Sequence, residues 1–165
     1  MPTLQFPFLR RTQVLLVLCT LLWSAPAVAQ SAAAPPLLAK ATTLEGAGFD
    51  PTALKGKVVM LFYWSTRCAV CRSHLPELRA NMVGWRNKPF VLVTVNVDSD
   101  ATEWRAYEHL VTQTQSARPV VLWSPGQVAT KLPLTLVLDT NGKVFARHEG
   151  RIAPEAWDSV AEILP

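Results

Sequence analysis

Cysteines and long apolar runs are both scarce in this chain of 165 residues. The 3 cysteines are Cys19, Cys68 and Cys71, and only two residues separate the last pair. A disulfide across so short a gap closes too small a loop to constrain much of the unfolded chain, so the spacing favours redox chemistry over a structural role. Beyond residue 29, no apolar run approaches the roughly 20 residues of a transmembrane helix, which argues against a later membrane span.

Clusters of basic residues and internal repeats are also missing. The formal net charge is +4, but outside the first residues no group of Lys and Arg forms the patch or stripe that nucleic-acid binding requires. We therefore expect no nucleic-acid partner. A chain of this length is expected to form one domain with its own hydrophobic core.

The beginning of the chain has the three parts of an export signal. Arg10 and Arg11 form a basic region, residues 14–23 form an apolar core, and residues 27–29 read Ala-Val-Ala, a small-residue cleavage site. The apolar core is about half the length needed to cross a bilayer, so cleavage is favoured over a retained membrane anchor.

Cleavage after this site sets the expected organisation of the chain. We predict a signal peptide over residues 1–29, a mature N-terminus at Gln30, a linker over residues 30–41 and one folded domain over residues 42–165. Cys19 would leave with the signal peptide. The mature protein is expected to be periplasmic or otherwise exported, and soluble once the signal has been removed.

A buried-strand pattern ends just before the cysteine pair. Residues 58–64 are all apolar and rich in β-branched and aromatic types, which is typical of a strand buried on both faces of a sheet. From Cys71 onward the apolar residues recur at helical spacing and predict a helix over about residues 69–87. The cysteines therefore lie where a strand meets a helix N-terminus, whose partial positive charge favours a thiolate and makes Cys68 the candidate nucleophile.

The rest of the chain predicts a mixed sheet. Asp100 and Glu103 match a capping box and indicate a helix that ends near Gln115. The turn signal at Asn141-Gly142 indicates an antiparallel hairpin. We expect an α/β fold whose mixed central sheet carries helices on both faces. The further predicted elements are strands at 90–97, 119–124, 134–138 and 143–147 and a helix at 154–164.

This order of elements resembles the thioredoxin superfamily and, within it, the exported TlpA/ResA-like thiol-disulfide oxidoreductases. The family's Gly-Lys, apolar strand and aromatic-Trp motif is matched in register by Gly56-Lys57 and Tyr63-Trp64, followed by Cys68 and Cys71. Pro76 stands five residues after the second cysteine, where the family kinks its active-site helix. The resemblance implies a thioredoxin-like fold.

The resemblance also assigns a substrate-binding segment. Pro133, Asp139 and Gly142 repeat the spacing of the family's cis-proline, acid and glycine turn. The resemblance implies a cis peptide bond before Pro133, with the backbone at Leu132 and Pro133 holding the substrate by strand-like hydrogen bonds. Trp64 is expected beside the site, where it contacts the substrate or forms a packing wall.

The function implied by the resemblance is disulfide exchange with protein thiols or small thiols. Cys68 would attack a substrate disulfide, and Cys71 would then release the product from the mixed disulfide. We expect a monomer that uses neither a metal nor a bound cofactor and works in the reductase direction. A membrane redox partner is expected to recycle it.

Two positions depart from the family and leave an alternative open. Phe62 stands where relatives place a buried Asp or Asn, and His74 stands where some reducing members place a Glu. His74 lies one helical turn beyond Cys71 and could act as the proton shuttle. Alternatively, Cys68, Cys71 and His74 could hold Cu(I) in a copper-binding thioredoxin-like carrier. Arg72, which directly follows the second cysteine, excludes a c-type haem attachment motif.

Overall fold

The computed structural model describes residues 38–127 and 131–165. The predicted signal peptide, the cleavage site and most of the predicted linker lie outside these residues. Within them, no helix is both long enough and apolar enough to cross a membrane. The elements, in chain order, are a short 3-10 helix η2 (Pro51–Leu54), β1 (Val58–Trp64), α1 (Ala69–Gly84), β2 (Phe90–Asn96), α2 (Thr102–Thr114), β3 (Val120–Trp123), β4 (Leu134–Leu138), β5 (Val144–Glu149) and α3 (Pro154–Ile163).

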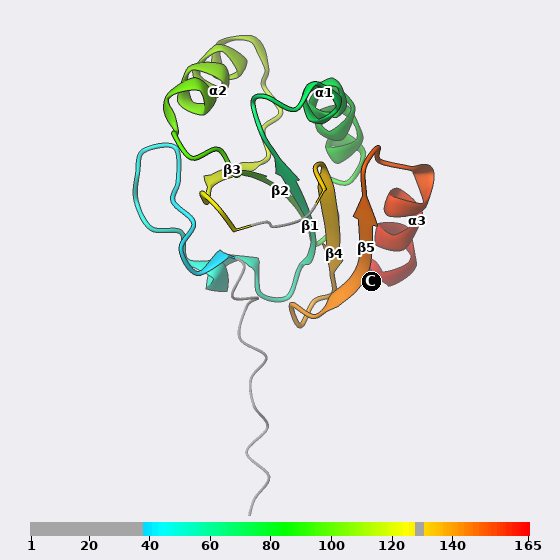
Figure 1. Cartoon of the computed structure of the whole chain (residues 1–165). Helices are drawn as coiled ribbons and strands as arrows, with labels where there is room; N and C mark the ends of the chain where they lie inside the picture. Colours follow the sequence, from blue (N-terminus) through cyan, green and yellow to red (C-terminus); the bar gives the residue numbers. More distant parts are fainter. Residues whose placement is uncertain (1–37, 128–130) are drawn as a thin grey trace, which may run out of the picture.

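The strands form one mixed sheet in the order β3-β2-β1-β4-β5 (Figure 1). β1 and β2 are parallel, as are β2 and β3, whereas β4 runs antiparallel to both β1 and β5. The mixed sheet and the hairpin predicted from the sequence are therefore confirmed. Every residue of β1 is at most 2% exposed, because this strand is central in the sheet and both of its faces are covered.

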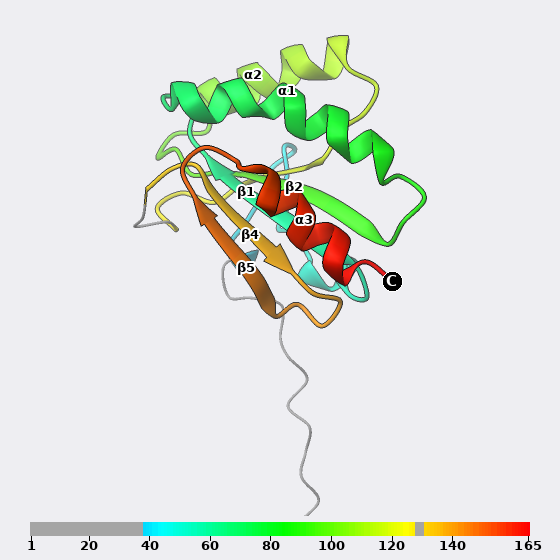
Figure 2. The ribbon, with the colours of Figure 1, turned by 90° about the vertical axis from the view of Figure 1, so that its right-hand side faces the viewer.

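All three α-helices contribute to one core cluster on one face of the sheet. Alternate residues of β1, such as Met60 and Phe62, pack in this cluster with side chains of α1, α2 and α3. The units β1-α1-β2 and β2-α2-β3 step across the sheet in the same direction, and right-handed connections then place both helices on the same face. Figure 2 shows α1 and α2 on the same side of the sheet.

Over the described ranges, the second face of the sheet is not covered by α-helices, contrary to the prediction. The other residues of β1 pack in a separate cluster with Leu38, Ala41 and Leu54 from the N-terminal segment. Among the described residues, the expected layer of α-helices on this face is replaced by the N-terminal segment, which includes the 3-10 turn η2. Leu38 and Ala41, predicted to belong to a linker, are 0% and 2% exposed, so the packed part of the chain begins at or before Leu38.

The N-terminal segment also reaches the edge of the sheet. Thr42 forms isolated bridges to Gly48 and to Trp123 of β3. With Trp123 it exchanges two backbone hydrogen bonds of 2.9 Å each. The segment therefore extends the sheet at single positions without forming a continuous edge strand.

The predicted capping box at the start of α2 is wrong. The N-cap is Ala101, which makes no side-chain cap bond. Asp100 instead accepts a hydrogen bond from the Thr102 backbone N–H at 3.0 Å, and Oε2 of Glu103 lies 3.0 Å from the Thr66 hydroxyl, whose single hydrogen it shares with Asp98. The carboxylate of Glu103, which a capping box would need, thus contacts Thr66 in the loop between β1 and Cys68.

Candidate active site

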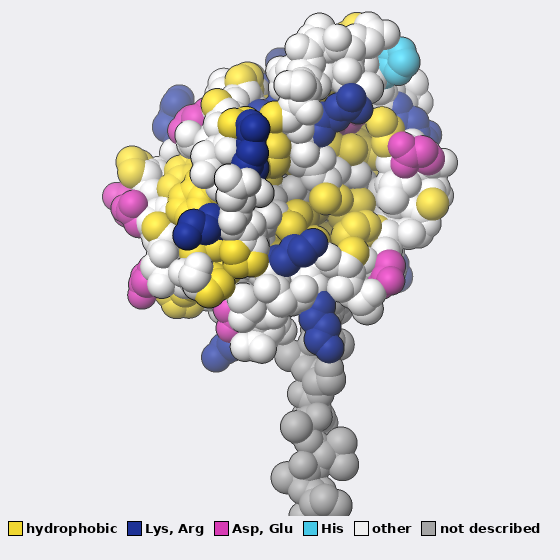
Figure 3. Space-filling view, turned by 180° about the vertical axis from the view of Figure 1, so that it is seen from behind, with side chains coloured by type: hydrophobic (Ala, Val, Ile, Leu, Met, Phe, Trp, Pro, Cys, Tyr) yellow, Lys and Arg dark blue, Asp and Glu magenta, His cyan; other side chains and the backbone are white. Residues whose placement is uncertain are grey.

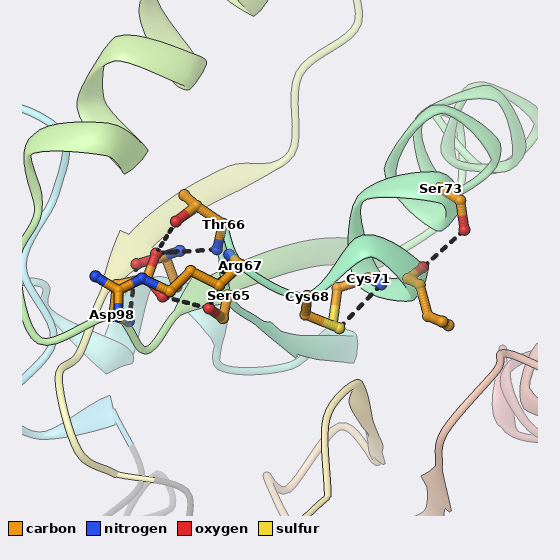
Figure 4. The surroundings of a disulfide bond; sticks show 9 residues. Ser65, Thr66, Arg67, Cys68, Cys71, Ser73 and Asp98 are labelled. Carbon is orange, nitrogen blue, oxygen red and sulfur yellow. Dashed lines mark hydrogen bonds between the residues drawn. A yellow bond between two sulfur atoms is a disulfide. The ribbon is translucent and has the colours of Figure 1, made fainter.

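Cys68 and Cys71 are joined by a disulfide at the start of α1 (Figure 4). Cys68 is the N-cap residue of α1, and its Sγ accepts a hydrogen bond from the backbone N–H of Cys71 at 3.1 Å. This contact places the sulfur against the positive end of the helix, as the sequence predicts. When the pair is reduced, the same N–H would favour the thiolate of Cys68.

The two sulfurs lie in different environments. Cys68 is half-buried, whereas Cys71 is 0% exposed and belongs to the core cluster formed by the helices. Solvent and a substrate can therefore reach Cys68 but not Cys71. This asymmetry matches the roles expected for an attacking and a resolving cysteine.

Asp98 organises the loop between β1 and Cys68. Its carboxylate accepts hydrogen bonds from the Ser65 hydroxyl, from the Thr66 backbone N–H at 2.9 Å and from the Thr66 hydroxyl at 2.7 Å. The side-chain amide of Asn96 donates a further bond at 3.0 Å. Burial alone would raise the pKa of Asp98, but these hydrogen bonds outweigh it and lower the pKa below its ordinary value. The loop before Cys68 is thus attached to an ionised carboxylate.

Sequence reasoning missed Asp98. The signal was present, because Asp98 follows the end of β2, and β2 is parallel to the strand that leads into the cysteine loop. The carboxyl ends of neighbouring parallel strands meet at one edge of a sheet, which is where sites form in open α/β sheets. Which groups Asp98 binds, however, depends on the conformation of the loop at Ser65 and Thr66, which the sequence does not show.

A cavity of about 310 Å³ lies beside this loop. Its lining includes Arg67, Asp100, Glu103 and Leu132, so the predicted substrate-binding segment shares a cavity with the residue directly before Cys68. The Leu132-Pro133 peptide bond is cis, as the resemblance implied. Leu132 is half-buried and accessible from the cavity, whereas Pro133 is buried.

Trp64 is placed beneath the site. Its side chain is 0% exposed, and its ring packs edge-on against Tyr107 of α2 with a centroid distance of 5.2 Å. A fully buried ring offers no surface to a substrate in this conformation. The expected substrate contact is therefore replaced by the packing-wall role, in which Trp64 and Tyr107 support the end of β1.

His74 is buried in α1, one turn beyond Cys71. It is 4% exposed, and its Nδ1 lies 3.3 Å from Oε2 of Glu77. Its Nε2 is buried without a hydrogen-bond partner among the described residues. One ring nitrogen is thus oriented by a carboxylate, and the other remains available to exchange a proton.

The cysteine pair is not arranged as a metal site in this structure. Across residues 38–127 and 131–165, no group of three or more His, Cys, Asp or Glu side chains is arranged to hold an ion. Cys68 and Cys71 are bonded to each other, and the thiolate, not the disulfide, is the sulfur species that ligates a metal.

The comparisons with known proteins agree with this geometry. The AhpC/TSA family matches residues 31–156. The thiol-disulfide oxidoreductase ResA of Bacillus anthracis is 30% identical over 120 residues, which are 69% of this chain and 67% of the relative. A putative thiol:disulfide interchange protein DsbE from Chlorobium tepidum has the same fold, with a TM-score of 0.63 at 23% identity over 74% of this chain and 91% of that one. The chain therefore belongs to the AhpC/TSA family, among its thioredoxin-like, ResA-like thiol-disulfide oxidoreductases.

Proposed function

We propose that this protein is an exported enzyme that exchanges disulfides with protein or small-thiol substrates through Cys68 and Cys71. The observation that carries the proposal is the asymmetry of the pair: Cys68 is only half-buried and its Sγ is bonded to a helix N–H, while Cys71 is fully buried. The half-buried Leu132, which lines the cavity beside the loop before Cys68, supports substrate binding at this edge of the sheet.

The reaction proceeds in two exchange steps. In the reduced enzyme, the thiolate of Cys68 attacks one sulfur of a substrate disulfide, forms a mixed disulfide and releases the other substrate sulfur as a thiolate. The thiolate of Cys71 then attacks Sγ of Cys68, which releases the second substrate sulfur and closes the enzyme disulfide. Two electrons pass from the enzyme to the substrate.

The oxidised enzyme must then regain two electrons. We propose that a membrane redox partner supplies them by the reverse exchange, so that the reductase direction is the working one. The enzyme acts as a monomer, because one chain contains both cysteines and the segment at Leu132 and Pro133. The opposite direction uses the same steps and differs only in which disulfide is the more stable.

His74 acts as the proton shuttle for the second step. A thiol buried among apolar side chains ionises with difficulty, so resolution by Cys71 is accelerated by a base that takes its proton. His74 stands one turn further along α1, and its Nε2 has no hydrogen-bond partner among the described residues. Nε2 would accept the proton from Cys71, directly or through a water, and return it to the departing substrate thiolate.

Reduction of insulin by dithiothreitol tests the function. We expect the mature protein to accelerate precipitation of the insulin B chain, and the Cys68→Ser variant to leave the rate at that of dithiothreitol alone. An equal rate with and without the wild-type protein would refute the proposal. Copper bound to the reduced, purified protein, together with no insulin reduction, would instead favour the copper-carrier alternative that uses Cys68, Cys71 and His74.

A further inference from the structure

A second hollow, of about 510 Å³, lies at the far end of α1 from the cysteines. It is lined by the last turn of α1, the start of β2 and the segment that leads into β3, including Met82, Trp85, Phe90 and Arg118. α1 has 16 residues and is therefore roughly 24 Å long, at about 1.5 Å per residue. A ligand in this hollow would leave Cys68 uncovered.

The deeper lining of the hollow is aromatic. Trp85 and Phe90 are half-buried, with ring centroids 5.8 Å apart, and Phe90 packs in turn against Trp157 at 6.4 Å. Next to them, Val83 is 36% exposed. Partly exposed aromatic side chains in a concave surface are the groups on which protein interfaces concentrate their binding energy.

The outer lining of the hollow carries positive charge. Arg86 and Arg118 line it and are both exposed, and no Asp or Glu is among the lining residues. Within residues 38–127 and 131–165, the ion pairs are His74–Glu77 and Arg147–Glu149, so neither arginine is paired. Figure 3 looks onto this side of the molecule and shows hydrophobic side chains interspersed with Lys and Arg, while Asp and Glu lie mainly toward the periphery.

We propose that this hollow is a docking site for an acidic peptide segment of a partner protein. An apolar side chain of that segment would occupy the aromatic part, and flanking carboxylates would pair with the guanidinium groups of Arg86 and Arg118, whose forked geometry fits carboxylates. The aromatic residues Trp85 and Phe90 are more buried than the two arginines, which favours a peptide over a membrane, because a membrane-binding surface places its large apolar groups outermost. This inference concerns binding alone and does not depend on disulfide exchange.

Fluorescence anisotropy with a labelled peptide tests the proposal. The probe is a short peptide in which glutamates alternate with leucine and phenylalanine, and the control peptide carries glutamine in place of each glutamate. We expect the acidic probe to bind the mature protein at least about tenfold more tightly than the control peptide, and to weaken as salt is raised because ion pairs are screened. Equal binding of the two peptides, or no binding of either, would overturn the proposal.

Charge reversal locates the binding site. The double variant Arg86→Glu/Arg118→Glu should weaken binding of the acidic probe at least about tenfold, since each carboxylate contact becomes repulsive. The matched control is Lys55→Glu/Arg151→Glu, which changes the net charge equally at exposed positions outside the hollow and should retain most of the affinity. An equal loss in both double variants would mean that net charge alone attracts the probe and would overturn the assignment.

Two further measurements decide between occupants. Thermal unfolding confirms that each double variant is folded before its affinity is interpreted. Sedimentation with phosphatidylglycerol vesicles that depends on Arg86 and Arg118, without peptide binding, would overturn the proposal in favour of a membrane surface. A concentration-dependent dimer that dissociates on charge reversal would likewise overturn it in favour of a second copy of the chain.

Discussion

The two ends of α1 differ in both charge and chemistry. At the N-terminal end, the loop before Cys68 borders a cavity whose charged lining residues are Arg67, Asp98, Asp100 and Glu103. At the C-terminal end, the hollow is lined by Arg86 and Arg118 with no acid among its lining residues. The helix N-terminus favours a thiolate at Cys68. The cavity at the active-site end therefore carries charges of both signs, whereas the charged residues that line the far hollow are all positive.

The largest expected effect is at the active-site end and separates the two cysteines. Cys68→Ser should reduce insulin reduction to the background rate, because the accessible sulfur makes the first bond to the substrate. Cys71→Ser should accumulate a mixed disulfide that non-reducing electrophoresis detects, because the buried sulfur is needed only for release. Equal trapping by both variants, or by neither, would contradict the division of roles.

The second prediction concerns a buried carboxyl group, that of Glu108 in α2. Its charge interacts with Arg79 of α1, which lies between the two ends of that helix. Glu108 of α2 is 3% exposed, and burial raises its pKa to about 7 despite the opposing charge of Arg79. A carboxyl whose pKa is raised on folding binds its proton more tightly in the folded state, so its contribution to stability is present below about pH 4.5 and is lost as the pH rises toward 7.

Glu108→Gln should remove this loss. We expect the variant to be more stable than the wild type above pH 7, with a difference of the order of 2–3 kcal/mol that shrinks toward pH 4.5. Urea unfolding at several pH values measures it. Glu162→Gln, an exposed position on α3, is the control and should show no such pH dependence. Parallel pH profiles for wild type and Glu108→Gln would show that Glu108 is ionised at no cost in the folded protein.

The third prediction tests how the active-site end holds its negative charge. Asp98→Asn replaces an acceptor of several hydrogen bonds with a group that presents N–H to other donors, and should destabilise the fold by about 2 kcal/mol at neutral pH. A carboxyl whose pKa is lowered on folding stabilises above about pH 4 and loses this contribution in acid. The difference between wild type and variant should therefore shrink as the pH falls below 4. Asp158→Asn, at an exposed position of α3, is the control, and an equal effect there would argue against Asp98 as the organiser of the loop.

The smallest expected effect concerns the proton in the second exchange step. His74→Ala should slow resolution of the mixed disulfide about tenfold near neutral pH, and the difference should fade at high pH, where Cys71 ionises without help. Rapid-quench measurement of the mixed disulfide follows this step. His109→Ala, at an exposed position of α2, is the control. Unchanged resolution in His74→Ala across the pH range would leave His74 as a packing residue.

The sequence predicted the central part of the fold because its patterns there are local. The apolar run before Cys68 and the helical spacing after Cys71 place β1 and α1 with little ambiguity, and the Asn141-Gly142 signal places the hairpin. The cis bond before Pro133 followed from a family resemblance, since only about 5% of such bonds are cis and no local pattern marks them.

The features that the sequence did not predict depend on contacts between distant segments. The spacing of Asp100 and Glu103 predicted a capping box, but the carboxylate of Glu103 contacts Thr66 instead. His74 stands at the edge of a helical stripe, where neighbouring elements decide whether a side chain is covered. In the described part of the chain, the sheet face opposite the three α-helices is covered in part by Leu38 and Ala41, whose Ala- and Pro-rich surroundings resemble a linker in composition.

The backbone bonds between Thr42 and Trp123 also have a consequence for association between copies of the chain. An unpaired outer strand is a template onto which a strand of another molecule can add. At Trp123, β3 already has a partner on both sides, because β2 pairs with one edge and Thr42 occupies the other. Removal of the segment around Thr42 would free this position, so the N-terminal segment blocks the addition of a foreign strand at the Trp123 end of β3.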